Sequence, residues 1–153
     1  MDITVEQIKS LRQKTGIGIH DVKSALEEAK GNEEEAIKIL KKRGLSIAAK
    51  KSDRSTSQGL IDTYVHAGRI GAMVEVNCET DFVARNDDFK AFAHDLSLQI
   101  ASMNPENIEE LLKQEFFKDT SKTIEDYLNE TIAKIGENIR ISRIARFELG
   151  ETG

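Results

Sequence analysis

Apolar residues recur at intervals of three and four through the first third of the chain, which places them on one face of a helix. The pattern predicts three short helices between residues 4 and 44. Thr4 and Asn32 are suited to begin the first and third helices, because each is followed three residues later by a Gln or Glu that can complete a capping box. Gly44 is a natural helix stop, although residues 45–51 could extend the third helix.

Further along, the period changes from that of a helix to that of a strand. Residues 61–66 and 70–78 alternate in character around a turn at residues 67–69, so they predict a β-hairpin. A final strand near the C-terminus is expected to carry most of its apolar side chains on one face, namely Ile139, Ile141, Ala145, Phe147 and Leu149. This strand can join the hairpin in a small three-stranded antiparallel sheet.

Helical periodicity returns between the hairpin and the final strand. Asn86 can cap a helix that ends near Pro105, the only proline of the chain. Thr123 can cap another helix, with Gly136 as its stop. A shorter helix between them is predicted from apolar residues at helical spacing, which are Ile108, Leu111, Leu112 and Phe116.

Together these elements predict an α+β fold with three parts. A three-helix module occupies residues 1–45, a linker occupies residues 46–58, and an α+β core domain with helices packed on the sheet occupies residues 59–153. The polar linker is interpreted as a solvated tether rather than as a specific basic contact. Because a three-stranded sheet has exposed edges and can leave one face apolar, we expect the core domain to pair with a second copy.

Composition narrows the class of function. The 153 residues are 32% charged and 39% apolar, which is typical of a globular protein. The net charge of −5 argues against nucleic acid as a direct partner, because such binding depends on Lys and Arg neutralising phosphates. No run approaches the roughly 20 apolar residues of a membrane span, and the N-terminus lacks the pattern of a secretory signal. A cytoplasmic location without membrane contact is therefore expected.

Cys78 is the only cysteine, so an intrachain disulfide is impossible and a reducing compartment is the simplest inference. It lies on the apolar parity of its strand, which predicts a buried structural thiol rather than a nucleophile. The sequence has no G-x-x-x-x-G-K-[ST] phosphate loop, so the protein is not expected to be a GTPase itself. No cofactor is predicted.

Asp81 and Phe82 are candidate functional residues because they stand where a strand gives way to a helix. Such junctions often display side chains from a rigid scaffold. Local sequence alone favours a plainer interpretation, in which Phe82 packs inward and Asp81 caps the helix. The two interpretations differ in whether the aromatic ring is exposed.

A metal site is the sharpest rival interpretation of this region. The carboxylates and histidines close together in the sequence are Glu75, Glu79, Asp81, Asp87, Asp88, His66 and His94. Oxygen-rich sites can bind Mg²⁺ or Mn²⁺. However, these residues are divided between a strand and a helix start, and they follow neither the H-E-x-x-H nor the EF-hand spacing. No metal is therefore expected, and a metal-dependent hydrolase remains a third hypothesis.

Three separate stretches resemble the elongation factor Ts family, in the order in which that family has them. Residues 9–23 resemble its opening motif, Thr80-Asp81-Phe82-Val83 resembles its T-D-F-V motif, and residues 132–140 resemble its I-A-K-I-G-E-N-I stretch. By this resemblance the N-terminal helices form a ubiquitin-associated-like module. The chain looks like a short form with one core half and no helical hairpin insertion, and the resemblance does not cover residues 104–122.

The resemblance implies a guanine-nucleotide exchange factor, with no chemical catalysis of its own, for the GTPase elongation factor Tu in the elongation stage of translation. Thr80, Asp81, Phe82 and Val83 would contact the GDP-bound or nucleotide-free GTPase. Phe82 would act as a wedge that disturbs the phosphate and Mg²⁺ site, with Asp81 hydrogen-bonded beside it. Linkage then requires the factor to weaken GDP binding as much as GDP weakens binding of the factor.

The helical module would make a second contact with the GTPase through Arg12, Ile19 and His20. His20 departs from the family pattern, which commonly has large flexible apolar residues there. The short form implies a homodimer, in which two copies could serve two GTPase molecules. The alternative is a dimeric adaptor whose ubiquitin-associated-like module binds ubiquitin-like or peptide partners.

Overall fold

Three helices at the N-terminus form a module with its own small core. They are α1 (Val5–Thr15), α2 (Ile19–Glu28) and α3 (Glu33–Lys51), in a computed structural model that describes residues 2–15 and 17–151. Thr4 and Gln7 form the predicted capping box, with hydrogen bonds of 3.0 and 3.2 Å. Asn32 caps α3 by accepting from the Glu35 amide at 3.1 Å. The buried residues of the module are Leu11, Val22, Ala25, Leu26, Ala36 and Leu40.

Helix α3 continues seven residues beyond its predicted stop. Gly44 lies inside the helix and is buried, so the predicted stop at Gly44 is wrong and the alternative extension over residues 45–51 is confirmed. The reason is tertiary, because the second half of α3 packs on α7 (Ile124–Ile135) of the core. An ion pair of 3.0 Å between Lys41 and Asp126 joins the two helices. The first part of the predicted linker is therefore helix.

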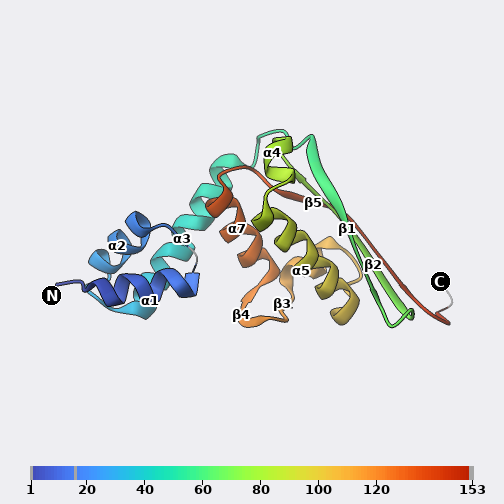
Figure 1. Ribbon diagram of the computed structural model, residues 1–153, viewed down its shortest axis with the longest axis horizontal. Helices are drawn as coiled ribbons and strands as arrows, with labels where there is room; N and C mark the ends of the chain where they lie inside the picture. The colour runs from blue at the N-terminus through green and yellow to red at the C-terminus, as the bar shows by residue number, and fades with distance from the viewer. Residues whose placement is uncertain (1, 16, 152–153) are drawn as a thin grey trace.

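The core domain is built on an antiparallel sheet in the strand order β1-β2-β5. Its strands are β1 (Gln58–His66), β2 (Ile70–Cys78) and β5 (Arg140–Glu148). The remaining elements, besides α7, are α4 (Asp81–Ala84), α5 (Asp87–Met103), α6 (Ile108–Lys113), β3 (Glu115–Phe116) and β4 (Asp119–Thr123). Figure 1 shows the helical module at one end of the molecule and the sheet at the other, with α5 and α7 on one side of the sheet. The predicted α+β class is confirmed.

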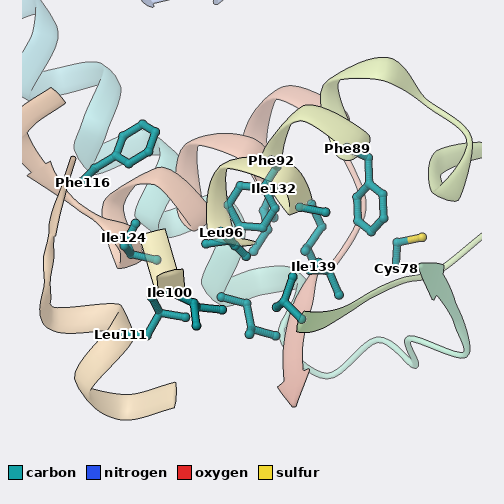
Figure 2. Packing of buried hydrophobic residues seen from close by; sticks show 14 of the residues in the cluster. Cys78, Phe89, Phe92, Leu96, Ile100, Leu111, Phe116, Ile124, Ile132 and Ile139 are labelled. Carbon is teal, nitrogen blue, oxygen red and sulfur yellow. The ribbon is translucent and has the colours of Figure 1, made fainter. Parts of the chain in front are cut away.

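Helix α5 supplies much of the core between the sheet and α7. Phe89, Phe92, Leu96 and Ile100 are fully buried on it, and Figure 2 shows them packed with residues of the neighbouring elements. Asn86 caps α5 as predicted, accepting from the Asp88 and Phe89 amides. This core includes Cys78 at the end of β2, shortly before α4 begins.

Residues 104–122 differ from the single short helix that the sequence predicts. Helix α6 ends at Lys113, and Phe116 instead lies in β3, paired with β4 in a short ribbon. The side chain of Phe116 is buried all the same, since it stacks on Tyr127 with ring centroids 4.5 Å apart. The apolar residue was recognised correctly, but its secondary structure was not.

A β-bulge in β5 divides its side chains between the two faces of the sheet. The pairing with β2 shifts between Glu75 and Val76, which face Arg143 and Ile141 respectively, so Ser142 is the extra residue. A bulge changes the face to which later residues point. The prediction that the apolar residues of β5 share one face is therefore wrong, because Ile141 is buried whereas Phe147 is 79% exposed.

The outer face of the sheet is open to solvent and largely apolar, apart from the ion pair of Glu75 with Arg143. No helix of the described residues covers it, as Figure 1 shows. Its exposed large side chains are Ile61, Val65, Met73 and Phe147. The alternate residues of β1, which are mostly polar, face α5 instead. Among them Asp62 accepts a hydrogen bond from the Ser97 hydroxyl at 2.7 Å and lies 3.1 Å from His94 Nδ1. The expectation of an uncovered apolar face is confirmed.

Candidate functional site

The four-residue helix α4 stands between the end of β2 and the start of α5 and carries the candidate residues. Thr80 is its N-cap, because the amide of Val83 donates to Thr80 Oγ1 at 3.3 Å. Asp81 is the first helical residue, so the interpretation of Asp81 as the cap is wrong. Figure 1 places α4 beyond the ends of the strands, away from the N-terminal helices α1 and α2.

Phe82 projects into solvent from α4. Its side chain is 77% exposed, so the plainer interpretation, in which it packs inward, is wrong. Arg85 lies close to it, with the guanidinium carbon 5.8 Å from the ring centroid. The same guanidinium forms an exposed ion pair of 3.1 Å with Asp81. Val83 is half-buried against the core and anchors the opposite side of the helix.

Glu137 holds the segment that leads into α4. Its Oε1 accepts the backbone amides of Glu79 and Thr80 at 3.1 and 3.0 Å, and its Oε2 accepts the hydroxyl of Thr80 at 2.7 Å. Hydrogen bonds to a carboxylate are stronger than those between neutral groups. Reasoning from the sequence missed this residue, although it lies within the stretch 132–140 that resembles the family.

Asn138 ties the same loop to the end of α3. Its backbone amide donates to Glu79 Oε1 at 3.0 Å, and its side-chain amide donates to the carbonyl oxygens of Ser52 and Arg54 at 3.4 and 2.9 Å. The guanidinium of Arg54 is 3.6 Å from Glu79 Oε1. The start of the non-helical linker is thus held by specific contacts, and its interpretation as a plain solvated tether is wrong for residues 52–54.

Cys78 is buried directly beneath this loop, and its Sγ lies 3.2 Å from the carbonyl oxygen of Thr80, to which it donates. Burial, followed by the negative charge of Glu137, raises the pKa of the Cys78 thiol to about 11. The group is therefore a neutral thiol at physiological pH. The burial of Cys78 confirms the prediction of a buried thiol, and a neutral thiol is a poor nucleophile.

Most of the acidic residues considered as metal ligands form ion pairs with different basic residues. Glu75 pairs with Arg143 at 2.8 Å, whose hydrogen bond lowers the pKa of that carboxyl group. Asp88 lies 3.5 Å from Lys134. His66 is bonded to Tyr64 rather than to a carboxylate. Within residues 2–15 and 17–151, no three His, Cys, Asp or Glu side chains are grouped so that they could hold a metal ion.

The candidate residues of the helical module form a second exposed set. Arg12 lies on α1, and Ile19 and His20 lie in the first turn of α2. All three are exposed, Ile19 by 50% of its surface. Figure 1 shows α1 and α2 away from α4, so the two candidate sets lie on separate surfaces.

No helix in the described part of the chain is both long enough and apolar enough to cross a membrane.

Comparison with known proteins finds relatives that cover both the helical module and the core domain. The family described as Elongation factor TS matches residues 79–153. Elongation factor Ts of Alkaliphilus oremlandii is 41% identical, over 99% of this chain and 91% of the relative. Elongation factor Ts of Carboxydothermus hydrogenoformans is 43% identical, over 97% and 90%, and that of Thermotoga sp. strain RQ2 is 42% identical, over 99% and 98%. These alignments span 195 or 196 positions, so the relatives contain residues that this shorter chain lacks.

Proposed function

Because the chain belongs to the elongation factor Ts family, we propose that it acts in translation elongation as a guanine-nucleotide exchange factor. In this proposal it binds elongation factor Tu, either GDP-bound or nucleotide-free, in the cytoplasm and promotes release of GDP. It carries out no chemical step of its own. It only has to bind the loosened GTPase more tightly than the GDP-bound form.

The observation that carries the proposal is the exposure of Phe82. A phenylalanine ring that is 77% exposed on a short helix leaves apolar surface in water, and covering that surface with a partner would be favourable. The ring is set on a motif that resembles T-D-F-V and is supported from below by Val83 and by the cap at Thr80. It is therefore fitted to enter a partner as a rigid group.

The mechanism follows from the demands of the nucleotide site. A GTPase holds GDP through phosphate contacts and a Mg²⁺ ion that requires near-ideal octahedral geometry. Insertion of Phe82 next to that site would displace a packed helix by about an ångström, since packed interiors transmit strain rather than absorb it. Asp81 would bond to the partner beside the ring once it exchanges Arg85 for a partner donor. Both effects would weaken the binding of GDP to the GTPase.

Arg12, Ile19 and His20 would supply the second contact, on a different part of the GTPase. Their exposure on α1 and α2 supports this role. An apolar side chain with neighbouring polar groups is a usual composition for the centre and rim of a transient interface. The contact would retain the partner while Phe82 acts elsewhere.

The outer sheet face supports a homodimer. Ile61, Val65, Met73 and Phe147 form an apolar surface on a three-stranded sheet, and a second copy would cover it symmetrically. Two chains would then present two α4 helices to two GTPase molecules. The test is light scattering at tens of micromolar, where wild type is expected to be a dimer and Met73→Lys to be a monomer. A wild-type monomer under these conditions would contradict the dimer.

The test of function is release of a fluorescent GDP analogue from purified elongation factor Tu, with this protein at substoichiometric amounts. Wild type is expected to accelerate release through many turnovers. Phe82→Ala is expected to abolish most of the acceleration while still binding the GTPase, whereas Phe117→Ala, at an aromatic residue in the β3–β4 turn, serves as the matched control. If wild type gives no acceleration, exchange is excluded and the adaptor function of the helical module takes its place.

A further inference from the structure

We propose that Glu137 is a positioning residue for exchange, which holds α4 so that Phe82 keeps the direction needed to enter the partner. The inference rests on the proposed function and extends it to a residue that lies 55 positions further along the chain than Phe82. Glu137 does not act on the nucleotide. It acts through Thr80, the cap of α4.

Helix α4 cannot fix its own position. It has four residues, each of which keeps part of its surface exposed. Isolated helices shorter than about 12 residues are marginal in water, so contacts outside α4 must define where it lies. Val83 supplies an apolar contact on one side, and the polar contact is the cap at Thr80.

The hydroxyl of Thr80 links Glu137 to α4. A hydroxyl has one proton to donate and lone pairs that accept. Here the proton is donated to Glu137 Oε2 at 2.7 Å, which leaves a lone pair for the amide of Val83 at 3.3 Å. The carboxylate thus fixes the orientation in which Thr80 can cap the helix.

The other oxygen of Glu137 fixes the backbone in front of the cap. It accepts the amides of Glu79 and Thr80 at 3.1 and 3.0 Å. Glu79 reciprocates by accepting the amide of Asn138 at 3.0 Å. Each loop therefore satisfies backbone groups of the other with a carboxylate, so the direction of the chain entering α4 is set from both sides.

Glu137→Gln is the informative substitution because it preserves size and one carbonyl oxygen. That oxygen can still accept the two backbone amides. The new amide group, however, donates, so it would occupy one of the two lone pairs of the Thr80 hydroxyl and leave the proton of that hydroxyl without its present acceptor. Only the link to the cap is reversed. Glu130→Gln, which changes a carboxylate of α7 that pairs with Lys122 at 2.9 Å, is the matched control.

The first measurement is the exchange rate as a function of the concentration of elongation factor Tu bound to a fluorescent GDP analogue. Glu137→Gln is expected to lower the maximal rate about five- to tenfold, the factor that corresponds to loss of one helix cap, with little change in the half-saturating concentration. Glu130→Gln, the matched control, should retain the wild-type rate. In a Phe82→Ala background Glu137→Gln should have no further effect, since no ring remains to be positioned.

The second measurement is amide hydrogen exchange of the free protein, which does not depend on activity. Glu137→Gln should accelerate exchange at Val83 and Ala84, whose amides bond to Thr80, and leave the amides of β2 unchanged. If wild type is active but Glu137→Gln matches it in both measurements, the inference is overturned. If wild type itself fails to release nucleotide, the proposed function fails, and hydrogen exchange alone decides whether Glu137 holds α4.

Discussion

Gly44→Ala should stabilise the protein, which is the reverse of what is expected for a glycine that ends a helix. Gly44 lies inside α3, where glycine is less favourable than alanine by about 1 kcal/mol. There is room for the methyl group, because a Cβ at this position would be 3.9 Å from both the Cβ of Ala133 and the carbonyl oxygen of Asn129. That is an ordinary van der Waals separation, so no clash offsets the gain.

The expected increase in the free energy of unfolding is therefore about 1 kcal/mol. For a chain of this length the melting temperature should rise by roughly 2–4 °C. Urea denaturation followed by circular dichroism measures the first quantity, and a thermal scan measures the second. Gly18→Ala is the control with the opposite sign, because Gly18 is the N-cap of α2 and alanine is less suited to that position. An unchanged or lowered stability of Gly44→Ala would refute a continuous α3 at this separation from α7.

Three further predictions concern the core. Gly59→Ala should destabilise the sheet by more than about 2 kcal/mol or prevent folding, because its Cβ would lie 2.1 Å from the carbonyl oxygen of Val76; the urea midpoint and the yield of folded protein measure this. The raised pKa of the Cys78 thiol stabilises the fold fully below about pH 9, and this contribution should be lost as the pH rises towards 11, so the urea midpoint should fall across that window less steeply in Cys78→Ala. Asp95→Ala should cost about 1–3 kcal/mol in urea denaturation, because it leaves the hydroxyl of Tyr127, now 2.7 Å from the carboxylate, without this acceptor, whereas Asp95→Asn should cost less.

Local patterns in the sequence were sufficient for the starts of four helices, α1, α3, α5 and α7. The caps at Thr4, Asn32, Asn86 and Thr123 depend on residues two or three positions away, so a short window contains the whole signal. The buried parity of β2 is likewise visible in the sequence, since Val74, Val76 and Cys78 all face α5 and the core.

Features that depend on distant residues were not predictable in the same way. Gly44 carries a strong local stop signal, yet packing of α3 on α7 keeps the helix intact. The change of face in β5 arises from its register against β2, which the alternation of β5 alone does not contain. Glu137 meets Thr80 across 57 positions of the chain, so neither its spacing nor its type revealed the contact.

The site was predictable in part. The position of the exposed motif at residues 80–83 was indicated by the strand-to-helix junction and by the family resemblance. The exposure of Phe82 was implied by the family resemblance but not by the local sequence, because an aromatic residue at the start of a helix usually packs inward and here Val83 makes that contact.

The continuous α3 changes how the two proposed partner contacts combine. Its 19 residues span roughly 28 Å at the usual rise of a helix, and the residues directly after it are joined through Asn138 to the loop before α4. A flexible tether would spread the second contact over many positions and so dilute its effective concentration. A stiff spacer holds the second contact at one distance from the first. Binding through the helical module would therefore place Phe82 correctly on a GTPase of matching dimensions and on few other proteins.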